Sequence, residues 1–409
     1  MEKINYKIII VFVGLPASGK SYTSLHIKQY LEWIGYKIDI FNCGNYRRKI
    51  GNDDSHDASF FDHSNKKNVA DREYFLNCTL FDLNTFLVVK KGDVAILDAT
   101  NSTKKRREKI NKFFSLFSYS KKIIFIENIT TDLNIINTNI NFKQNSPDYK
   151  GYTIDEMRAD FQKRLSYYKD VYERINDEEE LNYIKMFDCG KKVTYNNIFG
   201  YIETLLLNFL INFRVCVKKI YITRHGESLY NLESRIGGDP DLTEEGYAYS
   251  KKLYNHISLK YKPEDIIIFT SNLKRTKNTA QLFIKNGYQV KHRELLNEID
   301  GGVCENMTYN EVKEKMPEIF EKRKKDKFNF KYPEGESYYD LIIRIKSFIL
   351  EINRVEKPIL IICHNAIVRT IYSYFLSYQH NEIPYIEVPL HKLNCIENNK
   401  YFYVKKNIM

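Results

Sequence analysis

Residues 14–21 read GLPASGKS and match the phosphate-binding pattern G-x-x-x-x-G-K-S/T at every fixed position. Glycines let backbone N–H groups turn inward around phosphate oxygens, and a helix that follows adds the positive end of its dipole. In this pattern Lys20 reaches the terminal phosphates of a nucleotide, and the hydroxyl of Ser21 helps to hold Mg²⁺. The segment therefore predicts a site for ATP and Mg²⁺ made by Gly14, Leu15, Pro16, Ala17, Ser18, Gly19, Lys20 and Ser21.

A carboxylate, Asp98, ends the apolar run DVAILD. At the end of a strand it would emerge at the sheet edge beside the phosphates. There it could bind Mg²⁺ through water or take a proton from an attacking hydroxyl. The alternative is that Asp98 caps a helix that begins in NSTKKRREK. The nearby phosphate loop favours the active role.

Basic side chains recur in the loops that should surround this edge. Each of them alone is more typical of a surface charge than of a ligand. Together they indicate a second anionic substrate besides the nucleotide, which favours a kinase over a simple ATPase. They are Arg47, Arg72, Arg106, Lys143 and Arg164.

A second, chemically different group of residues follows about two hundred positions later. Arg224 and His225 come directly after the strand-like run KKIYIT, and His364 ends the run PILIIC. Arg275 lies just beyond another predicted strand. Carboxyl ends of parallel strands meet at one edge, which is where α/β sheets place their ligands.

Two histidines and two arginines at one edge suit phosphoryl transfer through nitrogen. An unprotonated His225 would attack phosphorus, while Arg224, Arg275 and a cationic His364 would hold the equatorial oxygens. Glu298, in LNEIDGG, could give a proton to the leaving oxygen. The alternative for Glu298 is a helix or turn carboxylate without a chemical role.

The elements that must position these residues alternate between apolar strands and polar-faced helices. This alternation predicts an α/β fold with a parallel sheet covered on both faces, first in residues 1–213 and again, without sequence repetition, in residues 214–409. The two-domain boundary is placed after a helix at 198–213. The predicted strands are 7–13, 36–42, 93–99, 121–127, 218–223, 265–271 and 358–364, and the predicted helices are 21–35, 77–92 and 338–355. Residues 128–142 are interpreted as a loop plus a helix, and DEEE at 177–180 as a solvated turn.

Composition limits the partners and the compartment. The chain has 409 residues, a formal charge of +11 and seven scattered cysteines without a CxxC pair. The charge suits anions, either phosphorylated small molecules or nucleic acid, but aromatic residues do not interleave with Lys and Arg as nucleic-acid binding would need. The odd cysteine count favours a reducing compartment, and the N-terminus turns into a glycine loop instead of a signal peptide. We therefore expect a cytoplasmic protein with neither a membrane span nor a nucleic-acid partner.

Both halves, in this order, resemble the 6-phosphofructo-2-kinase/fructose-2,6-bisphosphatase family, from about residue 8 to 395. RHGE alone marks the histidine phosphatase superfamily, and the phosphate loop alone marks a vast group of nucleotide-binding proteins. The stretches that together carry the resemblance are GLPASGKSY, WIGYKIDIFNCGNYRR, ILDATNSTKKRR, SPDY, YITRHGES, RIGGD, LNEIDGGVCE, YPEGESYYDL and ICHNAIVR.

The resemblance implies a bifunctional, commonly homodimeric enzyme that makes and degrades fructose 2,6-bisphosphate. It implies that Asp98 is the catalytic aspartate, His225 the phosphohistidine and Glu298 the proton donor. In the kinase half it assigns fructose 6-phosphate to Arg47, Arg72, Thr100, Arg106, Lys143, Arg164 and Tyr168. In the phosphatase half it assigns ligand contacts to Arg224, Asn231, Gly237, Tyr309, Arg323, Lys327, Tyr338, Asn365 and Arg369, and phosphate holding to Arg275 and His364.

Three departures from the family pattern stand out. Thr130 replaces a cysteine usual in the kinase site, and Asn365 stands where a glutamine is usual. The chain is also one residue shorter near 132–142. None of the three departures removes a charged residue of the two predicted sites.

Besides the bifunctional enzyme, the sequence leaves two other interpretations open, and it also leaves open a variant of the bifunctional enzyme. The chain could act on the phosphorylated ends of RNA, or it could be a sensor that binds sugar phosphates without turnover. A sensor would be expected to lack a catalytic residue, yet Lys20, Asp98, His225, Glu298 and His364 are all present. The variant is a bifunctional enzyme in which one activity, mainly the kinase, dominates.

Overall fold

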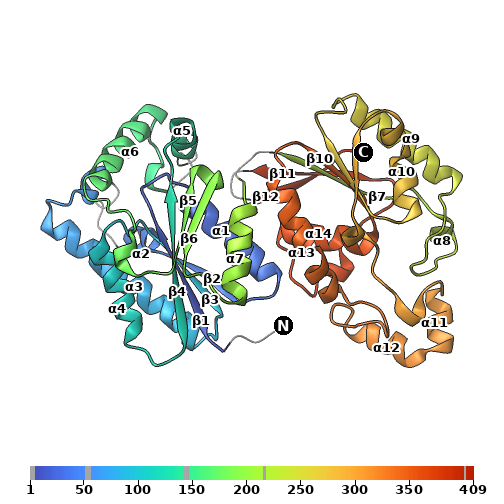
Figure 1. Cartoon of the computed structure of the whole chain (residues 1–409), viewed down its shortest axis with the longest axis horizontal. Helices are drawn as coiled ribbons and strands as arrows, with labels where there is room; N and C mark the ends of the chain where they lie inside the picture. The colour runs from blue at the N-terminus through green and yellow to red at the C-terminus, as the bar shows by residue number, and fades with distance from the viewer. Residues whose placement is uncertain (1–4, 51–56, 142, 144–146, 215–217, 400–401) are drawn as a thin grey trace. The chain divides into compact units, whose positions relative to one another are not determined.

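The computed structural model describes residues 5–50, 57–141, 143, 147–214, 218–399 and 402–409. The chain forms two compact units, Met1–Arg214 and Val215–Met409 (Figure 1). Each unit contains one six-stranded sheet flanked by helices, so the predicted α/β fold class is confirmed for both halves.

The sheet of the first unit has the order β2-β3-β1-β4-β5-β6. The first five strands are parallel, and β6 runs antiparallel at the edge. Residues 8–13 of β1 are all fully buried, as expected for a central strand covered on both faces. The strands are β1 (Lys7–Val13), β2 (Ile38–Asn42), β3 (Val94–Asp98), β4 (Lys121–Ile129), β5 (Tyr183–Phe187) and β6 (Lys192–Asn196).

Helices cover both faces of this sheet. Ile9, Val11 and Val13 share one core with side chains of α3 and α4. On the other face α1 packs against the sheet, and its Tyr30 ring stacks on Phe209 of α7 at 4.9 Å. The helices are α1 (Lys20–Trp33), α2 (Cys43–Ile50), α3 (Lys66–Val88), α4 (Lys104–Ser115), α5 (Leu133–Asn141), α6 (Ile154–Lys169) and α7 (Tyr201–Asn212), with short 3₁₀ helices η2 (Ala58–Phe61), η4 (Pro147–Tyr149), η5 (Asp177–Glu179) and η6 (Asp188–Gly190).

The sheet of the second unit has the order β12-β11-β7-β10-β8-β9. Strands β7, β10, β8 and β9 are parallel, whereas β11 is antiparallel to β7 and to β12. The strands are β7 (Lys219–Arg224), β8 (Ile267–Thr270), β9 (Gln289–His292), β10 (Ile359–Cys363), β11 (Leu393–Asn399) and β12 (Phe402–Asn407). The helices are α8 (Leu229–Leu232), α9 (Glu244–Ser258), α10 (Lys274–Lys285), α11 (Tyr309–Lys315), α12 (Pro317–Lys325), α13 (Tyr338–Arg354) and α14 (Asn365–Leu376), with η7 (Glu294–Leu296), η8 (Gly302–Cys304) and η9 (Ile383–Tyr385).

Two local predictions were wrong, each for a physical reason. Helix α3 begins at Lys66, eleven residues before the predicted start, because Asn65 caps it. The first buried residue of the helix is Phe75, so its first turns carry no apolar face that a pattern could reveal. The run 177–180 is not simply a solvated turn: the Glu179 carboxylate is buried and accepts two hydrogen bonds, at 2.8 and 2.7 Å, from the fully buried Arg107 guanidinium. A run of like charges cannot reveal which member faces a partner.

Among the described residues, no helix combines the length and apolarity that a membrane crossing requires. The six cysteines in that part of the chain are free, and Cys216 lies outside it.

Two candidate active sites

The phosphate loop follows β1 with three residues in left-handed backbone conformations, Gly14 (φ 140°), Ala17 (φ 59°) and Gly19 (φ 88°). Gly14 donates its N–H to the Thr100 carbonyl at 2.9 Å, which ties the loop to the segment that follows β3. A side chain at Gly14 would place Cβ only 2.5 Å from the Asn128 carbonyl oxygen. Glycine is therefore required at this position by both conformation and space.

Lys20 begins α1 and bends back over the loop. Its ammonium donates to the carbonyls of Gly14 at 2.9 Å and Leu15 at 2.7 Å. Burial lowers the pKa of Lys20 to about 7, and the neighbouring cations Lys143 and Arg164 add to this effect, although Asp98 opposes it. A lysine held at this pKa is ready to gain a full charge when phosphate arrives.

Asp98 is the last residue of β3, is buried, and accepts a hydrogen bond from the Asn42 amide at 2.7 Å. The alternative that it caps α4 is wrong, because Thr103 is the cap and its hydroxyl accepts from the Arg106 N–H at 3.2 Å. No group of three or more His, Cys, Asp or Glu residues gathers as a metal site in the described part of the chain. A Mg²⁺ ion that accompanies nucleotide phosphates needs only one or two protein oxygens, and Ser21 and Asp98 fit that requirement.

The predicted sugar-phosphate residues fall into two neighbouring groups. In the first, Arg47 is buried and forms an ion pair with Asp148, while Arg164 lies 3.8 Å from the same carboxylate and stacks over the Phe61 ring. Burial lowers the pKa of Lys143, a shift that Asp98 opposes and Arg164 reinforces, so Lys143 also belongs to this group.

In the second group, Arg106 pairs with Glu73 at 2.7 Å, and Arg72 donates to the Phe60 carbonyl at 2.9 Å. The Tyr168 ring lies 5.6 Å from that of Phe61, which links the two groups through one aromatic cluster. The Thr100 carbonyl accepts the Gly14 N–H, so Thr100 lies beside the phosphate loop.

In the second unit His225 follows β7 and is fixed by its own backbone. Its N–H donates to the Cys363 carbonyl at 2.9 Å, and ring Nδ1 lies 2.6 Å from the Gly226 carbonyl. A carbonyl only accepts, so Nδ1 carries the proton and Nε2 keeps its lone pair. Arg275 Nε donates to that lone pair at 3.2 Å. The nitrogen that phosphoryl transfer needs is therefore unprotonated, and without a ligand its lone pair accepts the Arg275 N–H.

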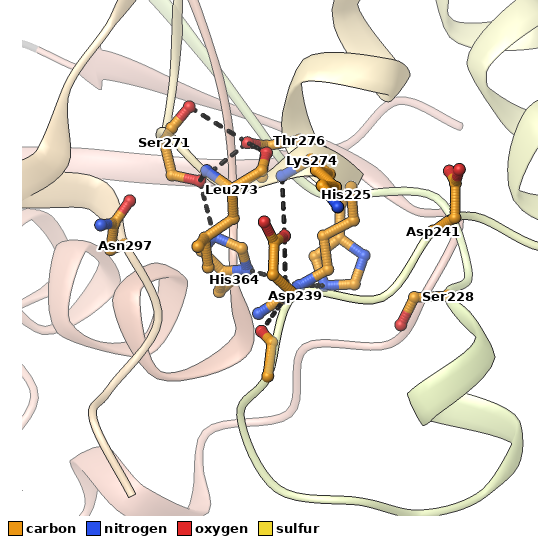
Figure 2. A network of polar contacts seen from close by, with 12 residues as sticks. His225, Ser228, Asp239, Asp241, Ser271, Leu273, Lys274, Thr276, Asn297 and His364 are labelled. Atoms are coloured by element: carbon orange, nitrogen blue, oxygen red, sulfur yellow. Dashed lines mark hydrogen bonds and ion pairs between the residues drawn. The ribbon is translucent and has the colours of Figure 1, made fainter. Parts of the chain in front are cut away.

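The same Arg275 N–H also reaches His364 Nδ1 at 3.2 Å. The rings of His225 and His364 lie next to each other, with their centroids 5.2 Å apart (Figure 2). Burial and the charge of Arg275 hold the pKa values of both histidines well below their usual value. Without a ligand the His364 ring is neutral, because Nδ1 accepts the Arg275 N–H and a cation buried beside Arg275 would be unstable without an anion. The expected cationic His364 concerns the state in which a phosphoryl group is bound, and it stays a prediction.

The two arginines are anchored at their far ends. Arg275 donates through Nη1 to the Gly238 carbonyl at 2.6 Å, and Arg224 donates through Nη1 to the Val388 carbonyl at 3.0 Å. The buried Nε of Arg224 has no hydrogen-bond partner among the described residues. A buried donor left unpaired is the signature of a place for an absent acceptor such as a phosphate oxygen.

Glu298 lies at the N-terminus of α14. Its carboxylate accepts from the backbone N–H groups of Asn365 at 3.0 Å, Ala366 at 3.2 Å and Ile299 at 3.0 Å. This geometry is that of a helix carboxylate, as the alternative expected, and the chemical role of Glu298 stays a prediction. The geometry does not exclude chemistry, since the same carboxylate interacts electrostatically with Arg224 and Arg275.

A second cationic group borders this site. Arg323 of α12 lies over the Tyr309 ring at 4.9 Å, and Arg369 of α14 donates to the Tyr338 hydroxyl at 3.0 Å. Burial, Arg323 and Arg369 lower the pKa of Lys327 to about 8. Composition would interpret EKRKKDK as a solvated helix face. Arg323 of α12 and Lys327 just after this helix are nevertheless half-buried, whereas the other residues of the run are exposed.

The remaining predicted contacts differ in what their side chains do. The Asn231 side-chain oxygen accepts two bonds from Ser228 at 3.0 Å, so it caps α8. Gly237 has φ 65°, and a Cβ there would overlap the Glu305 carboxylate. The buried side-chain oxygen of Asn365 has no partner in the described part of the chain, which leaves it available to a ligand.

Sequence reasoning missed three residues that support the site. Arg344 of α13 donates to the carbonyls of Leu295 at 3.1 Å, Asn297 at 3.0 Å and Glu298 at 3.3 Å. Glu305 accepts from the N–H groups of Gly238 and Gly301, and Ser271 contacts His364. Glu305 ends the quoted stretch LNEIDGGVCE, and Ser271 ends the predicted strand 265–271, so both had a signal in the sequence. No pattern pointed to Arg344.

Family models match both units. Residues 1–217 match the model described as 6-phosphofructo-2-kinase, and residues 220–407 match the histidine phosphatase superfamily, branch 1. Fold and matches together define a chain that joins a kinase domain to a histidine phosphatase domain.

Comparison with individual relatives narrows the assignment to one family. The chain is 40% identical to 6-phosphofructo-2-kinase/fructose-2,6-bisphosphatase of Gallus gallus, over 95% of this chain and 81% of that protein. It is 37% identical to a Saccharomyces cerevisiae protein named fructose-2,6-bisphosphatase, over 97% of this chain and 87% of that one. A second yeast protein, named 6-phosphofructo-2-kinase 1, is 36% identical over 98% of this chain and 51% of its own length. The chain belongs to the 6-phosphofructo-2-kinase/fructose-2,6-bisphosphatase family.

Replacing Gly14 by alanine tests the phosphate loop. We expect ATP to bind at least about tenfold more weakly, because strain of 1–3 kcal/mol in the loop reduces affinity correspondingly. Titration calorimetry measures the change. Gly151→Ala is the matched control, since Gly151 also has positive φ (93°) but open space around its Cβ. Equal affinities of the two variants would contradict the assignment.

The low pKa of Lys20 predicts proton uptake on nucleotide binding. With a pKa of about 7 the free side chain is mostly neutral at pH 8, and phosphates would restore its charge. ATP binding should therefore take up about one proton at pH 8 and, from Lys20, almost none at pH 6. Calorimetry in two buffers of different ionisation enthalpy measures this. Lys20→Arg, which stays charged, should remove the uptake at pH 8, and an unchanged uptake would refute the prediction.

Proposed function

We propose that this chain both makes and degrades fructose 2,6-bisphosphate, with one reaction in each unit. The observation that carries the proposal is the presence of two complete sets of reactive groups in one chain of this family, Lys20 with Asp98 and His225 with Arg275. Neither set lacks a charged or nucleophilic member, which argues against a sensor without turnover.

In the kinase unit the substrates are ATP and fructose 6-phosphate. Asp98 takes the proton of the sugar 2-hydroxyl, whose oxygen forms a bond to the γ-phosphorus as the bond to ADP breaks. Lys20 and the backbone of residues 14–19 hold the nucleotide phosphates. Ser21 and Asp98 would hold Mg²⁺, which supplies charge neutralisation between the phosphates when bound. Arg47, Lys143 and Arg164 offer a cationic surround for the sugar 6-phosphate.

In the phosphatase unit His225 Nε2 attacks the phosphorus of the 2-phosphate. The bond from phosphorus to the sugar oxygen breaks, and Glu298 gives that oxygen a proton. Water then attacks the phosphohistidine, with Glu298 taking back a proton, and inorganic phosphate leaves. Arg224, Arg275 and His364 hold the phosphoryl oxygens, while Arg323, Lys327 and Arg369 hold the 6-phosphate.

The balance between the two activities is a separate question. Relatives named for only one activity exist at 36–37% identity, so family membership does not set the ratio. Product release and small displacements decide such ratios. We further propose a homodimer and a cytoplasmic location; the free cysteines support a reducing compartment.

A pair of variants separates the two reactions. With Mg-ATP and fructose 6-phosphate, the wild type should form fructose 2,6-bisphosphate. Asp98→Asn should lose kinase rate by about 10²–10⁴ and keep the phosphatase, whereas His225→Ala should do the reverse. The activity that each variant keeps shows that the variant protein is folded. Radiolabelled phosphate trapped on the wild type and absent from His225→Ala would support the phosphohistidine.

Two results would contradict the proposal. One is a wild-type protein that forms no fructose 2,6-bisphosphate. The other is preferential phosphorylation of a 5′-hydroxyl RNA in competition with fructose 6-phosphate, which would favour the alternative substrate.

A further inference from the structure

Ser271 is a fully buried serine directly after β8, and its hydroxyl contacts the second histidine of the phosphatase unit (Figure 2). Its Oγ lies 2.8 Å from His364 Nε2, 2.7 Å from Thr276 Oγ1 and 3.1 Å from the Leu273 nitrogen. No role in the proposed reaction has used this residue so far.

The directions of these hydrogen bonds follow from what each partner can do. The Leu273 N–H can only donate. The Thr276 hydroxyl lies 2.8 Å from the Leu273 carbonyl and 3.2 Å from the Ser271 carbonyl, which only accept, so it gives its proton to one of them. Ser271 therefore donates to Thr276, and the lone pairs of its Oγ face Leu273 N–H and His364 Nε2.

Two independent contacts then give His364 the same tautomer. Ser271 accepts at Nε2, so Nε2 carries a proton. Arg275 Nε, which can only donate, approaches Nδ1 at 3.2 Å, so Nδ1 carries a lone pair. The hydrogen bond at one imidazole nitrogen decides the state of the other.

We propose that Ser271 is a positioning residue that keeps the proton of neutral His364 on Nε2, so that a further proton can be added only at Nδ1, on the side of the transferred phosphate. This inference rests on the proposed role of His364 in holding that phosphate. The bond to Ser271 is the same in the neutral ring and in the imidazolium, so no rearrangement accompanies protonation.

The surroundings explain why the proton arrives only with the ligand. Arg275 of α10, Arg224 and His225 at the end of β7, and Arg344 of α13 all disfavour a charge on His364. Glu298 is the acid of this site, and it accepts from the N–H groups next to His364 in the chain. A phosphate dianion beside Nδ1 reverses the balance. The ring then takes a proton from solvent and donates Nδ1–H to a phosphoryl oxygen.

Ser271→Ala tests the proposal by spectroscopy and by rate. Long-range ¹H–¹⁵N spectra of histidine-labelled protein, with His364→Gln to assign the signals, report the tautomer of His364 without and with inorganic phosphate. We expect the Nε2–H form in the wild type, added Nδ1–H with phosphate, and a mixed tautomer in Ser271→Ala. The phosphatase kcat/KM should fall about ten- to a hundredfold. Ser250→Ala, at a buried serine of α9 whose hydroxyl donates to the Gly246 carbonyl at 2.9 Å, is the matched control.

A second variant keeps the question decidable if Ser271→Ala does not fold. Thr276→Val removes the acceptor of the Ser271 proton, which frees that proton to turn toward His364 Nε2 and should raise the share of the Nδ1–H tautomer. An unchanged tautomer with kcat/KM within about twofold of wild type in the folded variant would overturn the proposal. A wild type without sugar bisphosphatase activity would refute the proposed function alone, because the spectra with inorganic phosphate do not depend on the sugar.

Discussion

One buried N–H, on Nε of Arg275, is shared between the lone pairs of two neutral imidazoles at 3.2 Å each. This arrangement is possible only because both rings expose an unprotonated nitrogen to the same point. In His225 the proton lies on Nδ1, which donates to the Gly226 carbonyl, and in His364 it lies on Nε2, which donates to Ser271. The phosphatase site depends on this constraint, since a proton on Nε2 of His225 would leave it without a nucleophile.

The kinase unit also contains buried cations, and it stabilises them differently. Burial also disfavours the charge of Arg47, but Asp148 compensates it within the protein. Lys20 instead satisfies its ammonium with loop carbonyls while its pKa falls to about 7. Lys20 follows β1 and Arg224 ends β7, so in each unit a buried cation lies near the carboxyl end of a parallel strand. An anionic ligand bound there can replace the solvation that the cation lost on burial.

The departures from the family pattern have distinct structural consequences. Thr130, in place of the usual cysteine, donates through its hydroxyl to the Ser18 carbonyl at 3.3 Å and so contacts the phosphate loop. Asn365 leaves its buried side-chain oxygen without a partner among the described residues. The first change ties Thr130 to a loop, whereas the second leaves an oxygen that could accept a hydrogen bond from a donor on a ligand.

The sequence by itself determined the α/β class, the central strands and the residues of the two motifs. It could do so because short-range patterns encode them: buried parallel strands are continuous apolar runs, and phosphate loops need glycine and lysine at fixed spacing. It did not predict β5, β6, β9, β11 or β12, which are edge or neighbouring strands with mixed burial patterns. Only the tertiary structure decided that Glu179 meets Arg107, that Arg344 holds the backbone of Glu298, and that His364 is neutral. Those facts depend on distances and burial between segments far apart in the chain, which no local pattern of residue types contains.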